Sequence, residues 1–253
     1  MSLAGPRGLA LVSGGGGDIG SAICRHLHAD GWGLAIGYRT AERAQSLAKD
    51  LNTSDVPALA VPLDLTDTDQ IRTTLGKLLL EERHIDAVVL NAGWNKSSSF
   101  LETDEAQWRT TVAVNLVGPM LITQLCLPAM VIAGEGVIVG ITSEAAKTGD
   151  ANNAIYATAK AGLAAFLRTI VREHGRDGIR ANSVAPGPID TSLLRSSFPD
   201  EETARVTVEK LIRLVPVRRL GQPDEVAAAV RYLVSEGHHV AGEHLSVGGG
   251  VVM

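Results

Sequence analysis

Tyr156 and Lys160 are the two residues whose types and spacing point most directly to chemistry. They lie four positions apart in the segment IYATAKAG, so a helix would place both side chains on one face, about 6 Å apart at their Cβ atoms. An ammonium group beside a phenol stabilises the phenolate. The pair therefore predicts that the pKa of Tyr156 is lowered from about 10 towards neutral pH, where a phenol can exchange protons. The alternative is an ordinary surface pair.

Ser143 is a candidate third member of this site. It ends the apolar segment GVIVGITS and precedes Tyr156 by 13 residues, which lets it reach the same edge of a sheet. Taken alone, a serine in such a place is most often a loop-capping hydroxyl.

The glycine-rich stretch SGGGGDIG, residues 13–20, is a candidate phosphate-binding loop. Gly15, Gly17 and Gly20 satisfy G-x-G-x-x-G after an apolar segment and at the start of the helical segment DIGSAICRHLHADG. Such glycines allow a tight turn and a close approach of the backbone to a pyrophosphate, and the helix start offers free amides and a positive dipole end. A glycine-rich turn without a ligand is the alternative.

The segment GYRT indicates which dinucleotide would bind. The dinucleotide-binding pattern places an acidic residue about 20 positions after the glycine loop, where it holds the ribose hydroxyls. Here Tyr38 stands at that place and Arg39 follows it. A guanidinium suits a 2′-phosphate, so the sequence predicts NADP over NAD. The alternative is a solvated arginine that opens the next helix.

A regular alternation of elements would position these residues. Seven short apolar segments alternate with longer segments of helical periodicity: GLALVS, GLAIGY, ALAVPL, IDAVVLNAG, GVIVGITS, IRANSVAPG and HLSVGG. This order predicts βαβ crossovers, and hence an α/β, doubly wound, Rossmann-type fold with a seven-stranded parallel sheet and helices on both faces. No linker or repeat divides the chain, so residues 1–253 are predicted to form a single domain. A long insertion follows the sixth segment and is predicted to form a substrate lid at about 188–215.

Composition excludes several functional classes. The net charge of −5 and the pI near 5.8 leave no basic field for nucleic acid. The N-terminus does not read as a signal peptide, and no apolar run approaches the roughly 20 residues of a membrane span, so a soluble, cytoplasmic protein is expected. Cys24 and Cys126 are far apart in sequence and lie outside any Cys/His cluster, which predicts buried thiols and no metal site.

Taken together, these motifs resemble the classical short-chain dehydrogenase/reductase family over essentially the full length. The matching segments, in order, are SGGGGDIG, LDLTD at 63–67, LNAG at 90–93, VNLVG around Asn115, Ser143, YATAK and NSVAPGPIDT at 182–191. The segment GQPDEVAAAVRYLVSEGHHVAGEHLSVGGG looks like the C-terminal segment of the family. VPVRRLGQPDEVA most resembles the 3-oxoacyl-carrier-protein reductase branch.

The resemblance implies a catalytic role for four residues. Tyr156 would be the general acid towards a carbonyl oxygen or the base towards an alcohol, and Lys160 would bind the nicotinamide ribose and tune the tyrosine. Ser143 would hydrogen-bond the substrate oxygen, and Asn115 would hold a water that connects Lys160 to solvent. The implied cofactor-binding residues are Gly14, Gly15, Gly17, Asp18, Ile19, Gly20, Arg39, Asp64, Leu65, Asn91, Ala92, Gly93, Tyr156, Lys160, Pro186, Gly187, Ile189 and Thr191.

Three of these residues also have simpler structural explanations. Asn115 could pair its amide with the backbone inside a helix, Asp64 could close a turn, and Thr191 could cap a helix.

Asp18 is the main departure from the family pattern, because it replaces the middle glycine of the loop. A carboxylate facing a pyrophosphate would repel it, by about 1 kcal/mol for charges 4 Å apart in water and more where water is excluded. Asp is also a favoured N-cap, so we predict that its side chain folds back onto the amides of the first helical turn and leaves Gly16 and Gly17 to approach the cofactor. Pyrophosphate binding is then expected to be weakened or reshaped, and not lost.

Three smaller departures accompany it. Leu90 stands at the first position of the family's NNAG, and Gly248 stands where the family often has Asp. Gly17 replaces the basic residue of many NADP-dependent members, which leaves Arg39 as the main indication of a 2′-phosphate.

The substrate is less defined than the reaction. The resemblance implies hydride transfer between NADP and a carbonyl or secondary alcohol, with a 3-oxoacyl thioester as one candidate. A catalytically silent nucleotide-sensing or scaffold protein on the same fold is the alternative. Candidate residues lining a substrate pocket are Trp94, Asn95, Glu144, Thr148, Asn152, Asn153, Leu193, Leu194 and Phe198.

Two helical segments indicate self-association. VNLVGPMLITQLCLPAMV and ATAKAGLAAFLRTIVREHG are apolar beyond one face, so part of each is predicted to pack against another subunit. The family resemblance implies a homotetramer.

Overall fold

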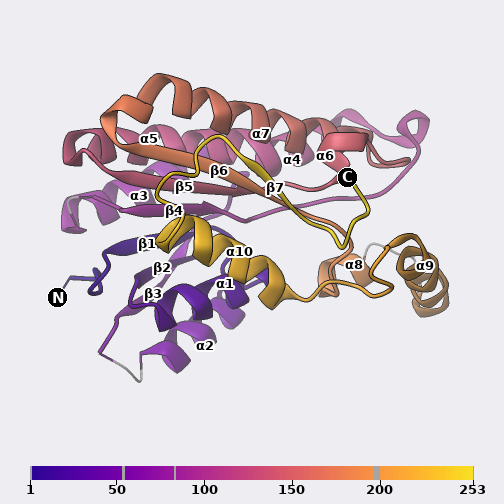
Figure 1. Ribbon diagram of the computed structural model, residues 1–253, viewed down its shortest axis with the longest axis horizontal. Coiled ribbons are helices and arrows are strands. Elements are labelled where there is room, and N and C mark those ends of the chain that lie inside the picture. The colour runs from indigo at the N-terminus through magenta and orange to yellow at the C-terminus, as the bar shows by residue number, and fades with distance from the viewer. Residues whose placement is uncertain (1, 53–54, 83, 197–199, 253) are drawn as a thin grey trace.

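Seven strands form one parallel sheet in the computed structural model, in the order β3-β2-β1-β4-β5-β6-β7 (Figure 1). The structure describes residues 2–52, 55–82, 84–196 and 200–252. The strands are β1 (Leu9–Val12), β2 (Gly33–Tyr38), β3 (Ala58–Pro62), β4 (Ala87–Leu90), β5 (Gly136–Ile141), β6 (Ile179–Pro186) and β7 (His244–Val247). Each lies within one of the seven predicted segments, so the predicted sheet is confirmed.

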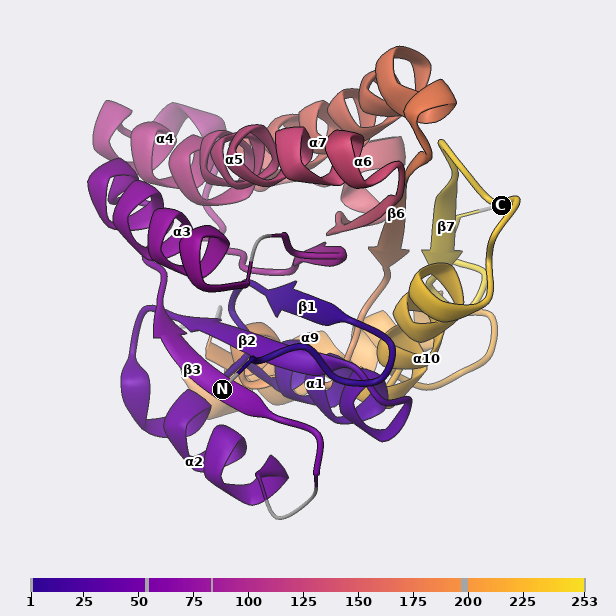
Figure 2. The same ribbon diagram turned by 90° about the vertical axis from the view of Figure 1, so that its left-hand side faces the viewer.

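Helices cover both faces of this sheet (Figures 1 and 2). One layer consists of α1 (Asp18–Ala29), α2 (Ala41–Leu51) and α10 (Pro223–Ser235). The other layer consists of α3 (Thr68–Glu82), α4 (Glu105–Val112), α5 (Gly118–Ala133) and α7 (Ala154–His174). Shorter helical segments are η1 (Phe100–Glu102), η2 (Ala113–Val117), α6 (Ala145–Thr148) and η3 (Gly175–Asp177). The predicted doubly wound arrangement is therefore confirmed.

The strands are apolar throughout because each face of the sheet has its own core. In β1, Ala10 and Val12 pack in the cluster beneath α1, α2 and α10, whereas Leu9 and Leu11 pack in the cluster beneath α3, α5 and α7. Successive side chains of a strand point to opposite faces, so a strand buried on both faces is a continuous apolar run.

The strand order reverses between β1 and β4, and this point sets the position of a ligand. The chain runs outward from β1 to β3 and then crosses back to β4 on the other side of β1. At such a reversal the loops after the two neighbouring strands diverge and leave a crevice outside their carboxyl ends. The loops that follow β1 and β4 here are the glycine-rich stretch and the LNAG segment.

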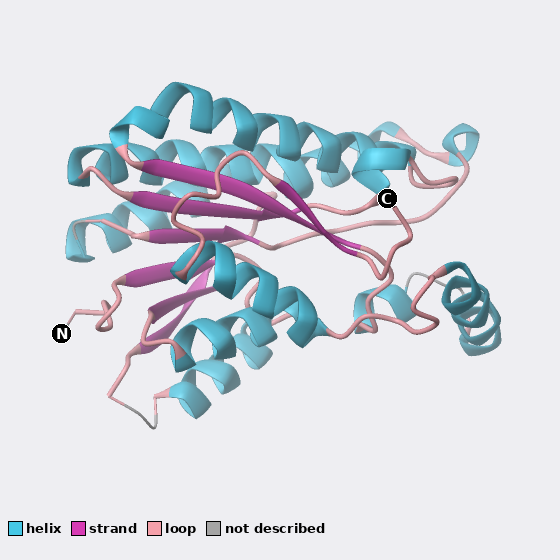
Figure 3. Ribbon diagram, in the orientation of Figure 1, coloured by secondary structure: helices cyan, strands magenta, loops and turns pink. Residues whose placement is uncertain are grey.

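The predicted lid region carries α8 (Ser192–Ser196) and α9 (Glu201–Leu214), which lie beyond the carboxyl ends of the strands (Figure 3). Its two ends are fastened together. The N–H of Asp190 donates to the carbonyl of Gly221 at 2.9 Å, and the N–H of Gly221 donates to the carbonyl of Pro188 at 2.9 Å. Phe198, a predicted pocket residue, lies outside the described residues.

Two helical stretches, Glu105–Ala133 and Ala154–Asp177, are long and apolar enough to cross a bilayer by length and composition alone. Polar residues interrupt both stretches, so the lack of a long uninterrupted apolar run in the sequence does not exclude them. Both stretches pack in the layer with α3 and contribute Ile122, Met130, Leu163 and Leu167 to the core. A helix that packs on a sheet in the interior of a protein passes the same test, so the finding is weak support for a membrane span.

Candidate active site

Three predicted catalytic residues converge at the carboxyl edge of β5. Ser143 lies two residues beyond the end of β5, and Tyr156 and Lys160 lie on the first turns of α7. The Ser143 hydroxyl lies close enough to the Tyr156 phenol to act on its pKa as a hydrogen-bond partner. The ammonium nitrogen of Lys160 lies 5.7 Å from the centre of the Tyr156 ring and donates to the carbonyl oxygen of Ile141 at 2.8 Å. Ser143 and Tyr156 remain half-buried, whereas Lys160 is buried behind them.

The predicted lowering of the Tyr156 pKa is wrong for the protein without a cofactor. Burial raises the pKa of Tyr156 to about 12, although the hydrogen bond with Ser143 acts to lower it, and the charge of Asp150 adds to the rise. Burial also lowers the pKa of Lys160 to about 7. Desolvation disfavours the charged form of both groups. Burial therefore dominates at both groups, and it removes much of the positive charge of Lys160 at neutral pH.

We expect Lys160→Met to change how stability depends on pH. The pKa of Lys160 is about 7 in the folded protein, against 10.5 as the ordinary value. Between these values the unfolded chain holds a proton that the folded protein lacks, so this group makes the wild type gain stability as pH rises through that window. The variant lacks this gain. Urea unfolding of both proteins at about pH 6 and about pH 9 measures the difference, and equal changes in both proteins would contradict it.

Asn115 is held in a helical irregularity that places it beside Lys160. It is fully buried in η2, a π-helical segment between α4 and α5. Its amide nitrogen donates to the carbonyls of Thr111 at 2.9 Å and Trp94 at 2.7 Å. A β-carbon placed on Gly93 would lie 3.4 Å from Asn115 Oδ1 and 3.6 Å from Lys160 Nζ. The expected pairing with backbone is present, and it fixes the amide at the predicted site; π-bulges of this kind are frequent at functional sites.

The glycine loop is shaped to receive an anion. A β-carbon on Gly20 would lie 2.2 Å from the carbonyl oxygen of Gly14, and one on Gly14 would lie 2.8 Å from the Cα of Ala92. Within the described ranges, we find no acceptor for the N–H groups of Asp18, Ile19 and Gly20. Free amides at the start of a 12-residue helix are a binding site for phosphate groups, so the loop fits the pyrophosphate of a dinucleotide.

Ser13 connects this loop to the segment after β4. Its hydroxyl accepts from the N–H groups of Asn91 at 3.0 Å and Ala92 at 3.2 Å. The side-chain amide of Asn91 in turn donates to the carbonyls of Ser13 and Gly14, both at 3.0 Å. Asn91 and Ala92 therefore lie against the glycine loop, and the role of Asn91, Ala92 and Gly93 as the floor of a cofactor site stays a prediction. Leu90, which precedes them, is buried in the core, so the departure from the family pattern at that position costs no polar contact.

The predicted N-cap role of Asp18 is wrong. Gly17 is the N-cap of α1, and Asp18 is the first helical residue. Its Oδ1 accepts from Arg43 Nη2 at 2.5 Å, and its Oδ2 accepts from the backbone N–H of Ser192 at 2.6 Å. Burial acts to raise the pKa of Asp18, but these hydrogen bonds outweigh it and leave the pKa below its ordinary value. Two strong donors from distant segments thus replace the local amides as partners of the carboxylate.

The residues predicted to hold the adenosine half of the cofactor make fewer contacts with one another than the predicted catalytic residues do. Arg39 is exposed just after β2, and we find no hydrogen bond or ion pair of it among the described residues. Asp64 closes a turn, since its Oδ1 accepts from the N–H of Thr66 at 2.9 Å and from its hydroxyl at 2.8 Å. The Leu65 side chain is buried against Gly118, so only its backbone is available to line a pocket.

The segment after β6 carries the residues that the family resemblance assigns to the nicotinamide side of the site. The N–H of Gly187 donates to the carbonyl of Val247 at 3.1 Å, and Ile189 is buried. Pro186 ends β6, where its carbonyl accepts from the N–H of Glu144 at 3.0 Å. Thr191 caps α8, because its hydroxyl accepts from the N–H of Leu194 at 3.2 Å. The alternative explanation of Thr191 as a helix cap is therefore realised.

Glu144 accounts for the glycine at position 248. The Glu144 side chain is buried, and a β-carbon on Gly248 would lie 2.0 Å from its Oε1. Burial raises the pKa of Glu144, against the lowering effects of the Ser246 hydroxyl and of Lys147. Ser246 is near enough to have this effect, yet among the residues that the structure describes neither carboxylate oxygen has a hydrogen bond of good geometry. A buried carboxyl thus occupies the space beside position 248, the position at which the family pattern has an Asp.

Two of the predicted substrate loops meet beside Tyr156. The amide of Asn95 donates to Asn153 Oδ1 at 2.9 Å, and the N–H of Ser98 donates to the carbonyl of Asn152 at 2.9 Å. Asn152 has a positive φ of 66°. These contacts join the segment after β4 to the start of α7. Leu193, a predicted pocket residue in the lid segment, is exposed to solvent.

Sequence reasoning missed Arg43, Ser192 and the connecting role of Ser13. Arg43 lies in the first turn of α2, and no motif marks it as different from any other surface arginine. Ser192 acts through its backbone N–H, which no side-chain pattern reveals.

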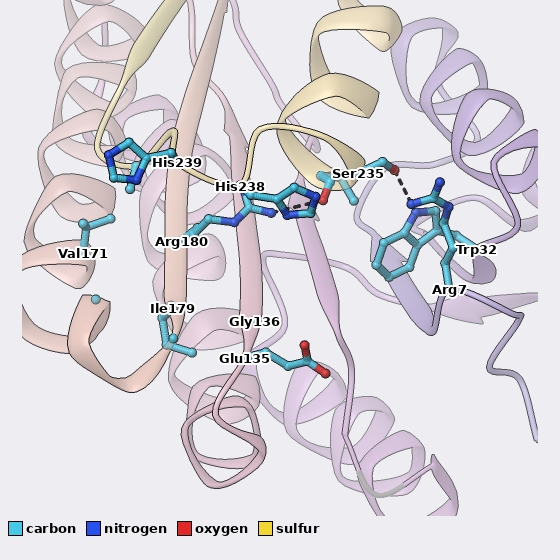
Figure 4. A pocket seen from close by; sticks show the side chains of 14 residues that line it. Arg7, Trp32, Glu135, Gly136, Val171, Ile179, Arg180, Ser235, His238 and His239 are labelled. Carbon is cyan, nitrogen blue, oxygen red and sulfur yellow. Dashed lines mark hydrogen bonds between the residues drawn. The ribbon is translucent and has the colours of Figure 1, made fainter.

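A separate cavity of about 590 Å³ lies at the opposite, amino edge of the sheet (Figure 4). Arg7, Trp32, Arg180 and His238 contribute to its walls. The Arg180 guanidinium donates to the carbonyls of Leu233, Val234 and Gly237, so it completes the end of α10. The glycine loop and Tyr156 are at the carboxyl edge, so this cavity is not the candidate active site.

Comparisons with known proteins agree with this geometry. A family model described as enoyl-(acyl carrier protein) reductase matches residues 16–252. The chain is 35% identical to cis-4-hydroxycyclohexanecarboxylate dehydrogenase of Sinomonas cyclohexanicum. The match extends over 244 residues, which are 96% of this chain and 95% of that protein.

Two further relatives are reductases of acyl thioesters by name. The chain is 29% identical to 3-oxoacyl-[acyl-carrier-protein] reductase of a Synechocystis strain, over 97% of each chain. It is 32% identical to acetoacetyl-CoA reductase of an Acinetobacter strain, over 97% of this chain and 98% of that protein. The chain therefore belongs to the classical short-chain dehydrogenase/reductase family, in its 3-oxoacyl-carrier-protein reductase-like branch, and is an NAD(P)-dependent oxidoreductase of that family.

Proposed function

We propose that the protein reduces a carbonyl group with NADPH, using Tyr156 as the proton donor. The observation that carries this proposal is the convergence of Ser143, Tyr156 and Lys160 at one edge of the sheet, next to the glycine loop. Ser143 and Tyr156 are half-buried, whereas Lys160 is buried.

The reaction divides between protein and cofactor. A bound nicotinamide supplies the hydride that adds to the carbonyl carbon. Ser143 donates a hydrogen bond to the carbonyl oxygen, and Tyr156 transfers its phenolic proton to that oxygen as the electron pair of the C=O π bond moves onto it. Lys160, with a water that Asn115 would hold, would then return a proton from solvent to the phenolate. The protein thus positions the substrate oxygen and controls one proton.

The pKa of Tyr156 in the free protein suits the acid that carbonyl reduction needs. With a pKa raised to about 12, the phenol is protonated at neutral pH and can act as an acid. The opposite direction needs a phenolate, which a charged Lys160 beside an oxidised, positively charged nicotinamide would stabilise.

We propose that Arg39 selects NADP through the 2′-phosphate. Its exposed guanidinium at the end of β2 is unpaired among the described residues and can make charge-assisted hydrogen bonds to a phosphate. Arg39→Ala is expected to weaken NADPH binding by about 10-fold or more and to leave NADH binding unchanged. Fluorescence titration with each nucleotide measures this, and NADH serves as the internal control because it lacks only the 2′-phosphate. An equal loss for both nucleotides would contradict the role of Arg39.

We propose a short 3-oxoacyl thioester as the substrate, because two of the relatives named above act on such compounds by name. The test follows NADPH consumption with acetoacetyl-CoA and, in parallel, with 4-oxocyclohexanecarboxylate, the ketone that corresponds to the alcohol in the name of a third relative. Turnover of the thioester alone supports the proposal, and turnover of the cyclic ketone alone would redirect it. Binding of NADPH without turnover of any ketone would instead favour a nucleotide-sensing role.

Homotetramer formation and closure of the segment 188–215 over the substrate are also proposed. Val117, Met120 and Ile132 are exposed apolar residues of η2 and α5, which supports a subunit contact through this helix layer. The lid segment follows β6 at the predicted nicotinamide side and is tied at its base by Pro188, Asp190 and Gly221.

A further inference from the structure

Asp18 links three parts of the predicted cofactor site through one carboxylate. Its two oxygens have different partners: Arg43 in the first turn of α2, at 2.5 Å, and the backbone N–H of Ser192 at the start of α8, at 2.6 Å. The Asp18 side chain is 24% exposed and that of Arg43 is 58% exposed. The glycine loop, the adenosine side and the lid segment are therefore joined at a single, partly shielded group.

The position of this carboxylate conflicts with the anion that the loop would bind. Asp18 begins the helix whose free amides fit a pyrophosphate, and its lowered pKa keeps it charged at neutral pH. An uncompensated charge here would repel the pyrophosphate, and the repulsion grows as water is excluded. Arg43 places an opposite charge directly on the carboxylate, so the pair presents little net charge to a ligand.

We propose that Asp18, Arg43 and the Ser192 backbone form an ionic latch that sets dinucleotide affinity. Arg43 is a positioning residue: it neutralises Asp18 and so permits the pyrophosphate to bind beside it, without contacting the cofactor itself. Asp18 in turn holds the start of the lid segment against the glycine loop through Ser192. This proposal rests on the proposed binding of a nicotinamide dinucleotide at the loop.

A double-mutant cycle tests the neutralising role, with NADPH and NADH affinities measured by fluorescence titration. Arg43→Gln alone is expected to weaken the binding of both nucleotides about 5- to 10-fold, because it leaves the charge of Asp18 without its ion-pair partner. Asp18→Asn alone is expected to leave affinity equal or higher. In the double variant most of the loss should disappear. Arg109→Gln, which removes an exposed arginine paired with Glu105 at the same 2.5 Å on the opposite helix layer, is the matched control and should change nothing.

Several outcomes would overturn this role. If Arg43→Gln weakens binding equally in the wild-type and Asp18→Asn backgrounds, Arg43 contacts the cofactor directly. If the loss is confined to NADPH, Arg43 is a ligand of the 2′-phosphate. Failure of the wild type to bind either nucleotide would refute the proposed function itself, and is thereby distinguished from failure of the latch.

The link to the lid is tested without any cofactor. Asp18→Ala removes the acceptor of the Ser192 N–H, so backbone hydrogen exchange in residues 190–196 of the free protein should become several-fold faster. Arg43→Gln keeps that acceptor and should leave exchange in this segment close to the wild-type rate. Unchanged exchange in the Asp18→Ala variant, in a protein that retains wild-type thermal stability, would overturn the link.

Discussion

Tyr156→Phe is expected to lower the rate of carbonyl reduction by about 100- to 10,000-fold while NADPH still binds. The substitution removes one oxygen and leaves the ring against which Lys160 lies at 5.7 Å. Without the phenol, no group at this position can give a proton to the carbonyl oxygen. Steady-state rates at saturating NADPH, together with NADPH titration by fluorescence, separate the loss of chemistry from any loss of binding.

Tyr232→Phe is the matched control for this prediction. Tyr232 lies on α10 with 43% of its surface exposed, on the far helix layer from α7, so removing its hydroxyl should leave turnover unchanged. Tyr156→Phe is also expected to leave the folded protein intact, because the same ring fills the same space. Retained turnover in Tyr156→Phe would contradict the proposed mechanism and would assign proton transfer to another group.

Gly20→Ala is expected to abolish nucleotide binding and to destabilise the protein. The added carbon would lie 2.2 Å from the carbonyl oxygen of Gly14 and 2.7 Å from the amide nitrogen of Asn91. That amide joins the glycine loop to the segment after β4, so the clash separates the two halves of the cofactor floor. Overpacking of this kind costs about 1–3 kcal/mol, and the displaced loop no longer presents its amides to a pyrophosphate. Chemical denaturation and NADPH titration measure the two effects.

Gly76→Ala is the control, because it is expected to raise the stability of the protein where Gly20→Ala lowers it. Gly76 lies inside α3, and a carbon added there would meet no atom within 4 Å among the described residues, apart from its chain neighbours and the backbone of its own helix. Alanine should stabilise the helix by about 0.5–1 kcal/mol, because glycine loses more backbone freedom on folding. If Gly20→Ala behaved like Gly76→Ala, with intact nucleotide affinity, the close approach at Gly20 would have no part in binding.

Much of the fold follows from local patterns that need no tertiary information. The strands are continuous apolar runs because both faces of a parallel sheet are buried, and the intervening segments carry helical periodicity. The spacing of Tyr156 and Lys160, four residues apart, places them on one helix face in any helix. The position of Ser143 after β5 follows from the end of an apolar run.

The sequence alone therefore determined the parallel sheet, the order of its strands along the chain, and which residues gather at its carboxyl edge. Only the tertiary structure decided the pKa values of Tyr156 and Lys160 and the hydrogen-bond partners of Asp18. Burial, which depends on all surrounding segments, raises the pKa of Tyr156 and lowers that of Lys160, opposite to what an exposed pair would show. The partners of Asp18 are 25 and 174 residues away in sequence, so no local rule for helix capping could have found them. A carboxylate accepts from the strongest donors that folding brings within reach, and only the packed chain determines which donors those are.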